Sequence, residues 1–108
     1  MATPIWQWSA VDTAGAIRDR RVTSEEVVHA HLDRMRAANP AINAIVVDLS
    51  APAILAARAA DRALAQGATP GKLHGVPVTI KINIDVEGQA NSNGVWPSRR
   101  ISRREIRR

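Results

Sequence analysis

Apolar side chains recur every three or four residues in three stretches of the chain, a spacing that places them on one face of a helix. The pattern predicts helices over about residues 10–19, 23–39 and 52–66, the third of them rich in alanine. Alanine favours helix but buries little apolar area, so we expect only a small hydrophobic core from these helices.

Helix boundaries are marked by residues whose chemistry suits a helix end. Ser9 can cap the first helix, and Thr23 opens the second with Thr-Ser-Glu-Glu, a capping-box pattern. We expect the second helix to stop at Asn39-Pro40, because the residue before a proline is disfavoured in the helical conformation. Gly67 is typical of the residue that follows a helix, and it marks the end of the third one.

Two further stretches predict β-strands. The short β-branched run over residues 42–47 is consistent with a buried strand. Over residues 76–86 apolar and polar residues alternate strictly, which is typical of a strand with one covered face. The chain is therefore expected to hold both helices and strands, and Lys81 lies in the middle of the polar face of the second strand.

Lys81 admits two interpretations. From the alternation alone, the polar face meets water and Lys81 is an ordinary solvated lysine. If that face is covered by more protein, burial disfavours the charged amine, and a neutral lysine can accept a proton from a serine. Thr79, Asn83 and Asp85 share the polar face and are candidates to orient the amine.

The run from Leu73 to Lys81 reads Leu-His-Gly-Val-Pro-Val-Thr-Ile-Lys, and Asn83, Gly88 and Asn93-Gly94 follow it. This string resembles the segment of amidase-signature enzymes that carries their catalytic lysine, and the front half from Trp8 is similar to the helices that precede it. The resemblance implies an α/β fold, made of the N-terminal helices and first strands of an incomplete α/β/α sandwich. It implies hydrolysis of a carboxamide C–N bond by a Ser–Ser–Lys mechanism, with Lys81 acting through a second serine on the nucleophile.

Two departures from the family pattern stand out. Ile82 follows the lysine where many relatives have Asp. The Gly/Ser-rich loop that would supply both serines and the oxyanion hole is absent, and the serines at 9, 24, 50, 92, 98 and 102 are isolated. We therefore expect a truncated, inactive amidase fragment. A glutamine-hydrolysing amidotransferase subunit of the same family is the alternative.

The net charge of +5 belongs entirely to the end of the chain, because residues 99–108 hold six Arg and one Glu. We expect residues 1–95 to be the amidase-like part and residues 96–108 to be a basic tail, either disordered or derived from a frameshift or sequencing error. Clustered arginine can also bind nucleic acid, but the tail has no interleaved aromatics beyond Trp96 and the body is neutral, so this is the weaker alternative. A small interaction module that docks on a partner chain is another.

Several classes of site are excluded by composition. The chain has no cysteine, and His29 and His31 are two residues apart on a helix, a spacing that does not chelate a metal. No phosphate-binding or dinucleotide motif occurs, so we expect no cofactor and no metal. His74 would lie near the site in a structural or substrate-adjacent role. With neither a signal peptide nor an apolar membrane span, we expect a cytoplasmic protein that acts on a small-molecule amide.

Overall fold

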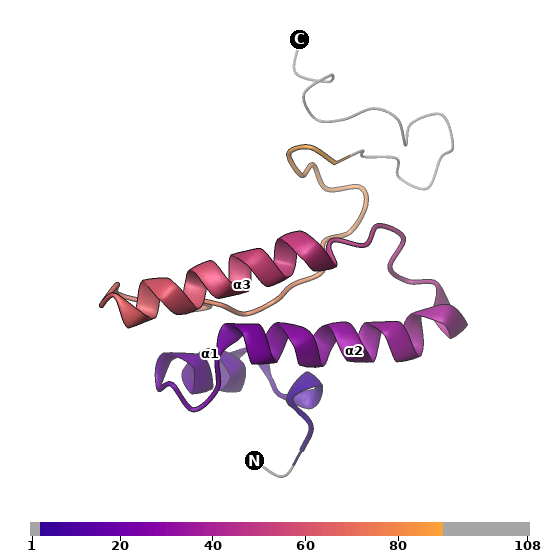
Figure 1. Ribbon diagram of the computed structural model, residues 1–108. Helices are drawn as coiled ribbons and strands as arrows, with labels where there is room; N and C mark the ends of the chain where they lie inside the picture. Colours follow the sequence, from indigo (N-terminus) through magenta and orange to yellow (C-terminus); the bar gives the residue numbers. More distant parts are fainter. Residues whose placement is uncertain (1–2, 90–108) are drawn as a thin grey trace. The chain divides into compact units, whose positions relative to one another are not determined.

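The computed structural model describes residues 3–89 of the chain (Figure 1). Within that range lie the 3-10 helix η1 (Ile5–Gln7) and the α-helices α1 (Ala10–Arg18), α2 (Ser24–Ile42) and α3 (Ser50–Ala65). The chain divides into two units, Met1–Pro77 and Val78–Arg108. The basic tail expected over residues 96–108, and the boundary expected at residue 95, lie outside the described residues.

The predicted capping residues begin the first two α-helices. The Ser9 hydroxyl accepts a hydrogen bond from the Asp12 N–H at 3.0 Å, and the Thr23 hydroxyl accepts one from the Glu26 N–H at 3.0 Å. Each bond satisfies a backbone donor that has no partner inside its own helix. Both capping predictions are confirmed.

Helix α2 does not stop where the sequence predicted. It continues through Pro40 to Ile42 and ends at Asn43, whose φ of 47° is left-handed. A proline inside a helix removes the bond that its own N–H would have made and crowds the preceding turn. Pro40 lies only two residues before the last helical residue, Ile42, and side-chain bonds from Asn39 hold the chain that follows. The Asn39 side chain accepts from the Ile45 N–H at 2.8 Å and donates to the Ile45 carbonyl at 2.9 Å.

Helix α3 begins two residues earlier than expected. The Asp48 carboxylate accepts hydrogen bonds from both the N–H and the hydroxyl of Ser50, and these two bonds lower the pKa of Asp48. At the other end Gly67 has a φ of 85°, which confirms it as the terminating residue. The Arg20 guanidinium donates to the Leu64 carbonyl in the last turn, where a cation is favourable.

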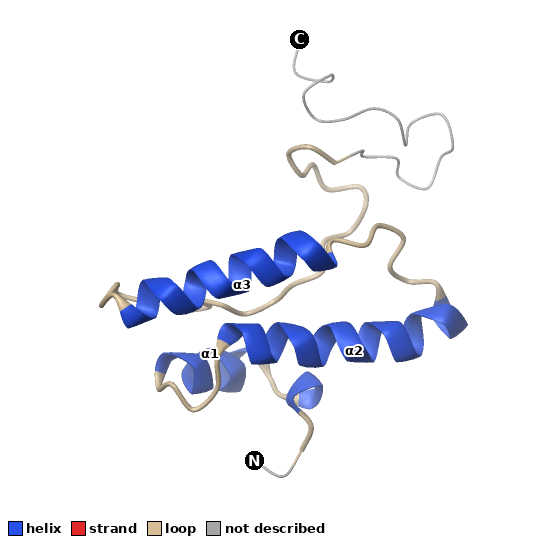
Figure 2. Ribbon diagram, in the orientation of Figure 1, coloured by secondary structure: helices blue, strands red, loops and turns tan. Residues whose placement is uncertain are grey.

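Helices α2 and α3 lie side by side and run in opposite directions in the first unit (Figures 1 and 2). One core cluster joins α1, α2 and α3 through Ile17, Val27 and Leu64, with exposed fractions of 1%, 0% and 8%. A second cluster between α2 and α3 is built on Leu32 and Ala57. The core is as small as the composition predicted, since it has few large side chains.

The expected α/β fold is wrong for the part of the chain that the structure describes, because residues 3–89 hold helices and irregular segments but no strand (Figure 2). The predicted strand over 42–47 is the end of α2 followed by a loop, and side-chain bonds from Asn39 take up the Ile45 backbone groups. The predicted strand over 76–86 is irregular, with turn bonds such as that from the Ile84 N–H to the Lys81 carbonyl at 3.0 Å. Alternation describes which side chains could share a face, but a strand forms only with a neighbouring strand to bond.

Candidate functional site

The Gly-Val-Pro turn before the candidate lysine is attached to the start of α2. The Ser24 hydroxyl donates to the Gly75 carbonyl at 2.7 Å, and only 1% of Ser24 is exposed. Gly75 has a φ of 77°, and a Cβ there would lie 2.9 Å from the Ser24 Cβ and Oγ. Glycine is therefore required at position 75 for both its backbone conformation and its close approach to α2.

Asp61 reaches across from α3 to the same point. Its Oδ1 accepts from the Ser24 N–H at 2.7 Å and its Oδ2 accepts from the Glu25 N–H at 3.0 Å. Together with the Thr23 cap, these bonds satisfy the first three N–H groups of α2 and set a carboxylate against the positive end of the helix dipole. Asp61 was not predicted as a functional residue, since its partners are 36 and 37 positions away.

His74 and Val76 hold the two sides of the turn. The His74 Nε2 lies 2.9 Å from the Ala60 carbonyl of α3, and since a carbonyl only accepts, Nε2 carries a proton and donates. Val76 packs against the cluster that contains Ile17 and Val27. His74 therefore attaches the turn to α3.

Lys81 and its three companions lie in the second unit. Thr79, Lys81, Asn83 and Asp85 fall within one irregular stretch, and all four side chains are exposed. The alternation that was expected to put them on one face of a strand is therefore replaced by turns. Lys81 begins one of these turns, as the acceptor of the Ile84 N–H.

The serines that the structure describes all stand at helix starts. Ser9 is a cap of α1, Ser50 bonds Asp48 before α3, and Ser24 is buried with its hydroxyl on Gly75. A hydroxyl that is engaged in a cap or buried against a carbonyl is poorly placed to attack a substrate. The serines at 92, 98 and 102 lie outside the described residues.

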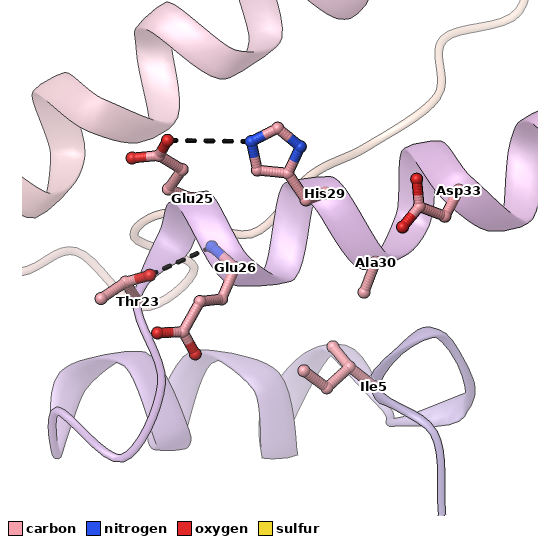
Figure 3. Close-up of a pocket in the computed structure, with 7 residues that line it drawn as sticks. All are labelled: Ile5, Thr23, Glu25, Glu26, His29, Ala30 and Asp33. Carbon is pink, nitrogen blue, oxygen red and sulfur yellow. Dashed lines mark hydrogen bonds and ion pairs between the residues drawn. The ribbon is translucent and has the colours of Figure 1, made fainter.

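The first unit also contains an open cavity of about 620 Å³ along α2 (Figure 3). It is lined by Ile5 and by polar residues of α2 that include Glu25, His29 and Asp33. Glu25 is already engaged there, with its Oε1 3.7 Å from His29 Nε2 and 3.0 Å from Arg58 Nε. None of the lining residues belongs to the lysine segment, and residues 3–89 contain no group of His, Asp or Glu side chains arranged to bind a metal.

Comparison with known families decides the identity. A family described as Amidase matches residues 26–96, more than half of the chain, and this range includes the Gly-Val-Pro turn and Lys81. The chain belongs to the amidase family. The amidase match also contains Asp61, the greater part of α2 and the whole of α3.

Curated relatives of this amidase chain are similar over most of its length. It is 62% identical over 92 residues to indoleacetamide hydrolase of Bradyrhizobium diazoefficiens, an alignment that covers 85% of this chain and 18% of that protein. It is 41% identical over 86 residues to a subunit of glutamyl-tRNA(Gln) amidotransferase from Acidothermus cellulolyticus, with 80% and 17% covered. It is 36% identical over 107 residues to fatty-acid amide hydrolase 2-A of Danio rerio, with 92% and 20% covered.

The amidase chain thus spans about a fifth of the length of the curated relatives it matches. No solved structure is a significant match to it. Among the helices of residues 3–89, none combines the length and the apolar character needed to cross a membrane.

Proposed function

We propose that this chain contributes the catalytic lysine to the hydrolysis of a carboxamide C–N bond, and that Lys81 is this lysine. The observation that supports the proposal is the amidase match over residues 26–96, which contains the whole run from Leu73 to Lys81. Lys81 is exposed in the part of the chain that the structure describes, and the proposal requires that other protein groups cover its amine and thereby favour the neutral form.

In the proposed reaction the neutral amine of Lys81 accepts a proton from one serine hydroxyl, and that serine accepts the proton of a second, nucleophilic serine. The nucleophilic oxygen then forms a bond to the amide carbon, the C–N bond breaks, and the leaving nitrogen takes up the proton from the relay. Water hydrolyses the resulting acyl-enzyme and regenerates the serine. Thr79, Asn83 and Asp85 are proposed to orient the lysine amine.

The proposed substrate class is a primary amide of an arylacetic acid, which would release ammonia. This follows the relative that is 62% identical and is named indoleacetamide hydrolase. The second candidate function is ammonia release from glutamine, which follows the amidotransferase relative that is 41% identical. The difference in identity favours the first.

We further propose that residues 1–108 by themselves do not hydrolyse amides. They contain the lysine but no Gly/Ser-rich loop, and the described serines are engaged at helix starts. A lysine without a serine nucleophile and an oxyanion site lacks the main sources of the rate enhancement.

A chimera tests the role of Lys81. In Bradyrhizobium indoleacetamide hydrolase, the aligned segment is replaced by the 92 matching residues of this chain, and indole-3-acetamide hydrolysis is measured as ammonia release. We expect an active chimera that loses about 10²- to 10⁴-fold in kcat on Lys81→Met, because a positioned base contributes that much to the rate.

The matched control is Lys72→Met, since Lys72 and Lys81 are the only two lysines in the chain. The control should retain activity within about 2-fold. An active chimera that tolerates Lys81→Met would overturn the assignment of Lys81. Preference of the active chimera for glutamine over indole-3-acetamide would favour the amidotransferase function.

A further inference from the structure

Three distant segments meet at the first residue of α2. Ser24 is buried, its N–H donates to Asp61 of α3, and its hydroxyl donates to the Gly75 carbonyl. Ser24 and Gly75 are 51 positions apart in the sequence. This contact is therefore a tertiary bond between the start of a helix and the turn that leads to the lysine segment.

The helix itself does not need a hydroxyl at position 24. The N-cap of α2 is Thr23, whose side chain already accepts from the Glu26 N–H. The backbone N–H of Ser24 is satisfied by Asp61. The Ser24 hydroxyl therefore makes no bond that α2 needs, and it donates to the Gly75 carbonyl of the turn instead.

The direction of the chain at Gly75 matters for Lys81. Six residues separate the two positions, and six extended residues span at most about 20 Å. The Gly75 carbonyl that Ser24 holds is therefore a fixed point close to the lysine along the chain. A catalytic base must lie within about 3 Å of the proton it accepts, and a misplacement of about 1 Å can cost 10²-fold in rate.

Resting on the function proposed above, we propose that Ser24 is a positioning residue for Lys81: its buried hydroxyl fixes the peptide of Gly75 and thereby the point from which the lysine segment starts. Asp61 supports it by holding the Ser24 backbone from α3. Ser24 acts through the turn and touches neither the substrate nor the reacting atoms.

The first test uses the 108-residue chain and a lysine-specific protease. Its two cleavage sites bracket the turn, because Lys72 lies three residues before Gly75 and Lys81 six residues after it. We expect Ser24→Ala to accelerate cleavage at Lys81, and at Lys72 on the other side of the turn, about 3- to 10-fold, the factor for loss of one hydrogen bond. Unchanged cleavage at Lys81, or the same acceleration in Ser50→Ala, would overturn the proposal.

The second test measures kcat and KM in the indoleacetamide hydrolase chimera. We expect Ser24→Ala to lower kcat about 10- to 100-fold with KM within about 2-fold, because the base is displaced while the substrate pocket is intact. Ser24→Cys keeps a side chain of similar size and a weak hydrogen-bond donor. Its kcat should lie between that of the unsubstituted chimera and that of Ser24→Ala, and this variant remains informative if the alanine variant does not fold.

The matched control is Ser50→Ala. Ser50 is also the first residue of a helix and its hydroxyl also donates to a neighbour, but that neighbour is Asp48. An equal loss of kcat in the Ser50 variant would mean that general destabilisation is the cause and would overturn the proposal. If the Lys81→Met chimera stays active, the proposed function fails. If Lys81→Met abolishes activity but the Ser24 variants keep the kcat of the unsubstituted chimera, the positioning role fails and the proposed function stands.

Discussion

The carboxylate of Asp61 ties α3 to the start of α2 through two backbone donors. We expect Asp61→Ala to lower the free energy of unfolding by about 1–3 kcal/mol, because two partly buried N–H groups lose their acceptor. Urea denaturation of the 108-residue chain followed by circular dichroism measures this loss.

Asp33→Ala is the control for the Asp61 variant. Asp33 is an exposed carboxylate of α2 that pairs with Arg36 at 3.3 Å. An exposed pair of this kind is worth about 0.5 kcal/mol or less, so the control should change the urea midpoint little. Equal losses in the two variants would contradict the capping role of Asp61.

Single residues were predictable from the sequence where their partners are close in the chain. Ser9 and Thr23 each bond an N–H three positions ahead, so a local pattern identifies them. Asp61 and Arg20 bond groups 37 and 44 positions away. No local pattern contains those partners, and the three-dimensional arrangement had to be known first.

At the scale of the elements, the end of α3 offers a matched pair of glycines. Neither Gly67 nor Gly71 has any atom within 4 Å of an added Cβ, but only Gly67 has a left-handed φ, of 85°. We expect Gly67→Ala to destabilise the fold by about 1 kcal/mol and Gly71→Ala to be neutral or slightly stabilising. The difference between the thermal midpoints of the two variants checks this expectation. Equal midpoints would contradict the role of Gly67 as the residue that terminates α3.

The helices were largely predictable as elements and the strands were not. A helix satisfies its backbone within one segment, so the spacing of Val28, Leu32 and their neighbours suffices to predict it. The segment over 76–86 shows the right alternation, yet Val78 and Ile80 are 73% and 53% exposed. A β-strand has to pair with a second segment of chain, and the alternation within one segment does not show whether such a partner exists.

At the scale of the whole molecule, acid is expected to weaken the fold in two steps. Burial lowers the pKa of His31, so below about 6.5 the unfolded chain binds a proton that the folded chain does not. Stability from this group is complete above that pH and falls as the pH drops toward the folded value. Hydrogen bonds from Ser50 lower the pKa of Asp48, whose contribution is lost below about 4.

The first step is measured by the urea midpoints of unfolding at about pH 8, 6 and 5. His31→Gln should make the midpoint nearly independent of pH between about pH 7 and pH 5. Asp48→Asn should reduce the further fall of the midpoint with pH below about pH 4. A steep loss of stability over the first interval in the His31 variant would assign that step to another group.

The candidate site was predictable in part. The Leu-His-Gly-Val-Pro motif identified the family and selected Lys81, because a motif is read from adjacent residues. The attachment of that motif to Ser24 and Ala60 was not predicted, since it joins residues far apart in the sequence of the first unit. The assignments of Lys81, Thr79, Asn83 and Asp85 all stay predictions.

The bond between Ser24 and Gly75 also has a consequence for synthesis on the ribosome. Ser24 is made 51 residues before its acceptor, an interval of roughly 3–10 s at translation rates of about 5–20 residues per second. During that time α2 can form, but its first hydroxyl has no carbonyl to bond and the Ile17 cluster lacks Val76. The nascent first unit is therefore completed only when the Gly-Val-Pro turn emerges, just ahead of the lysine.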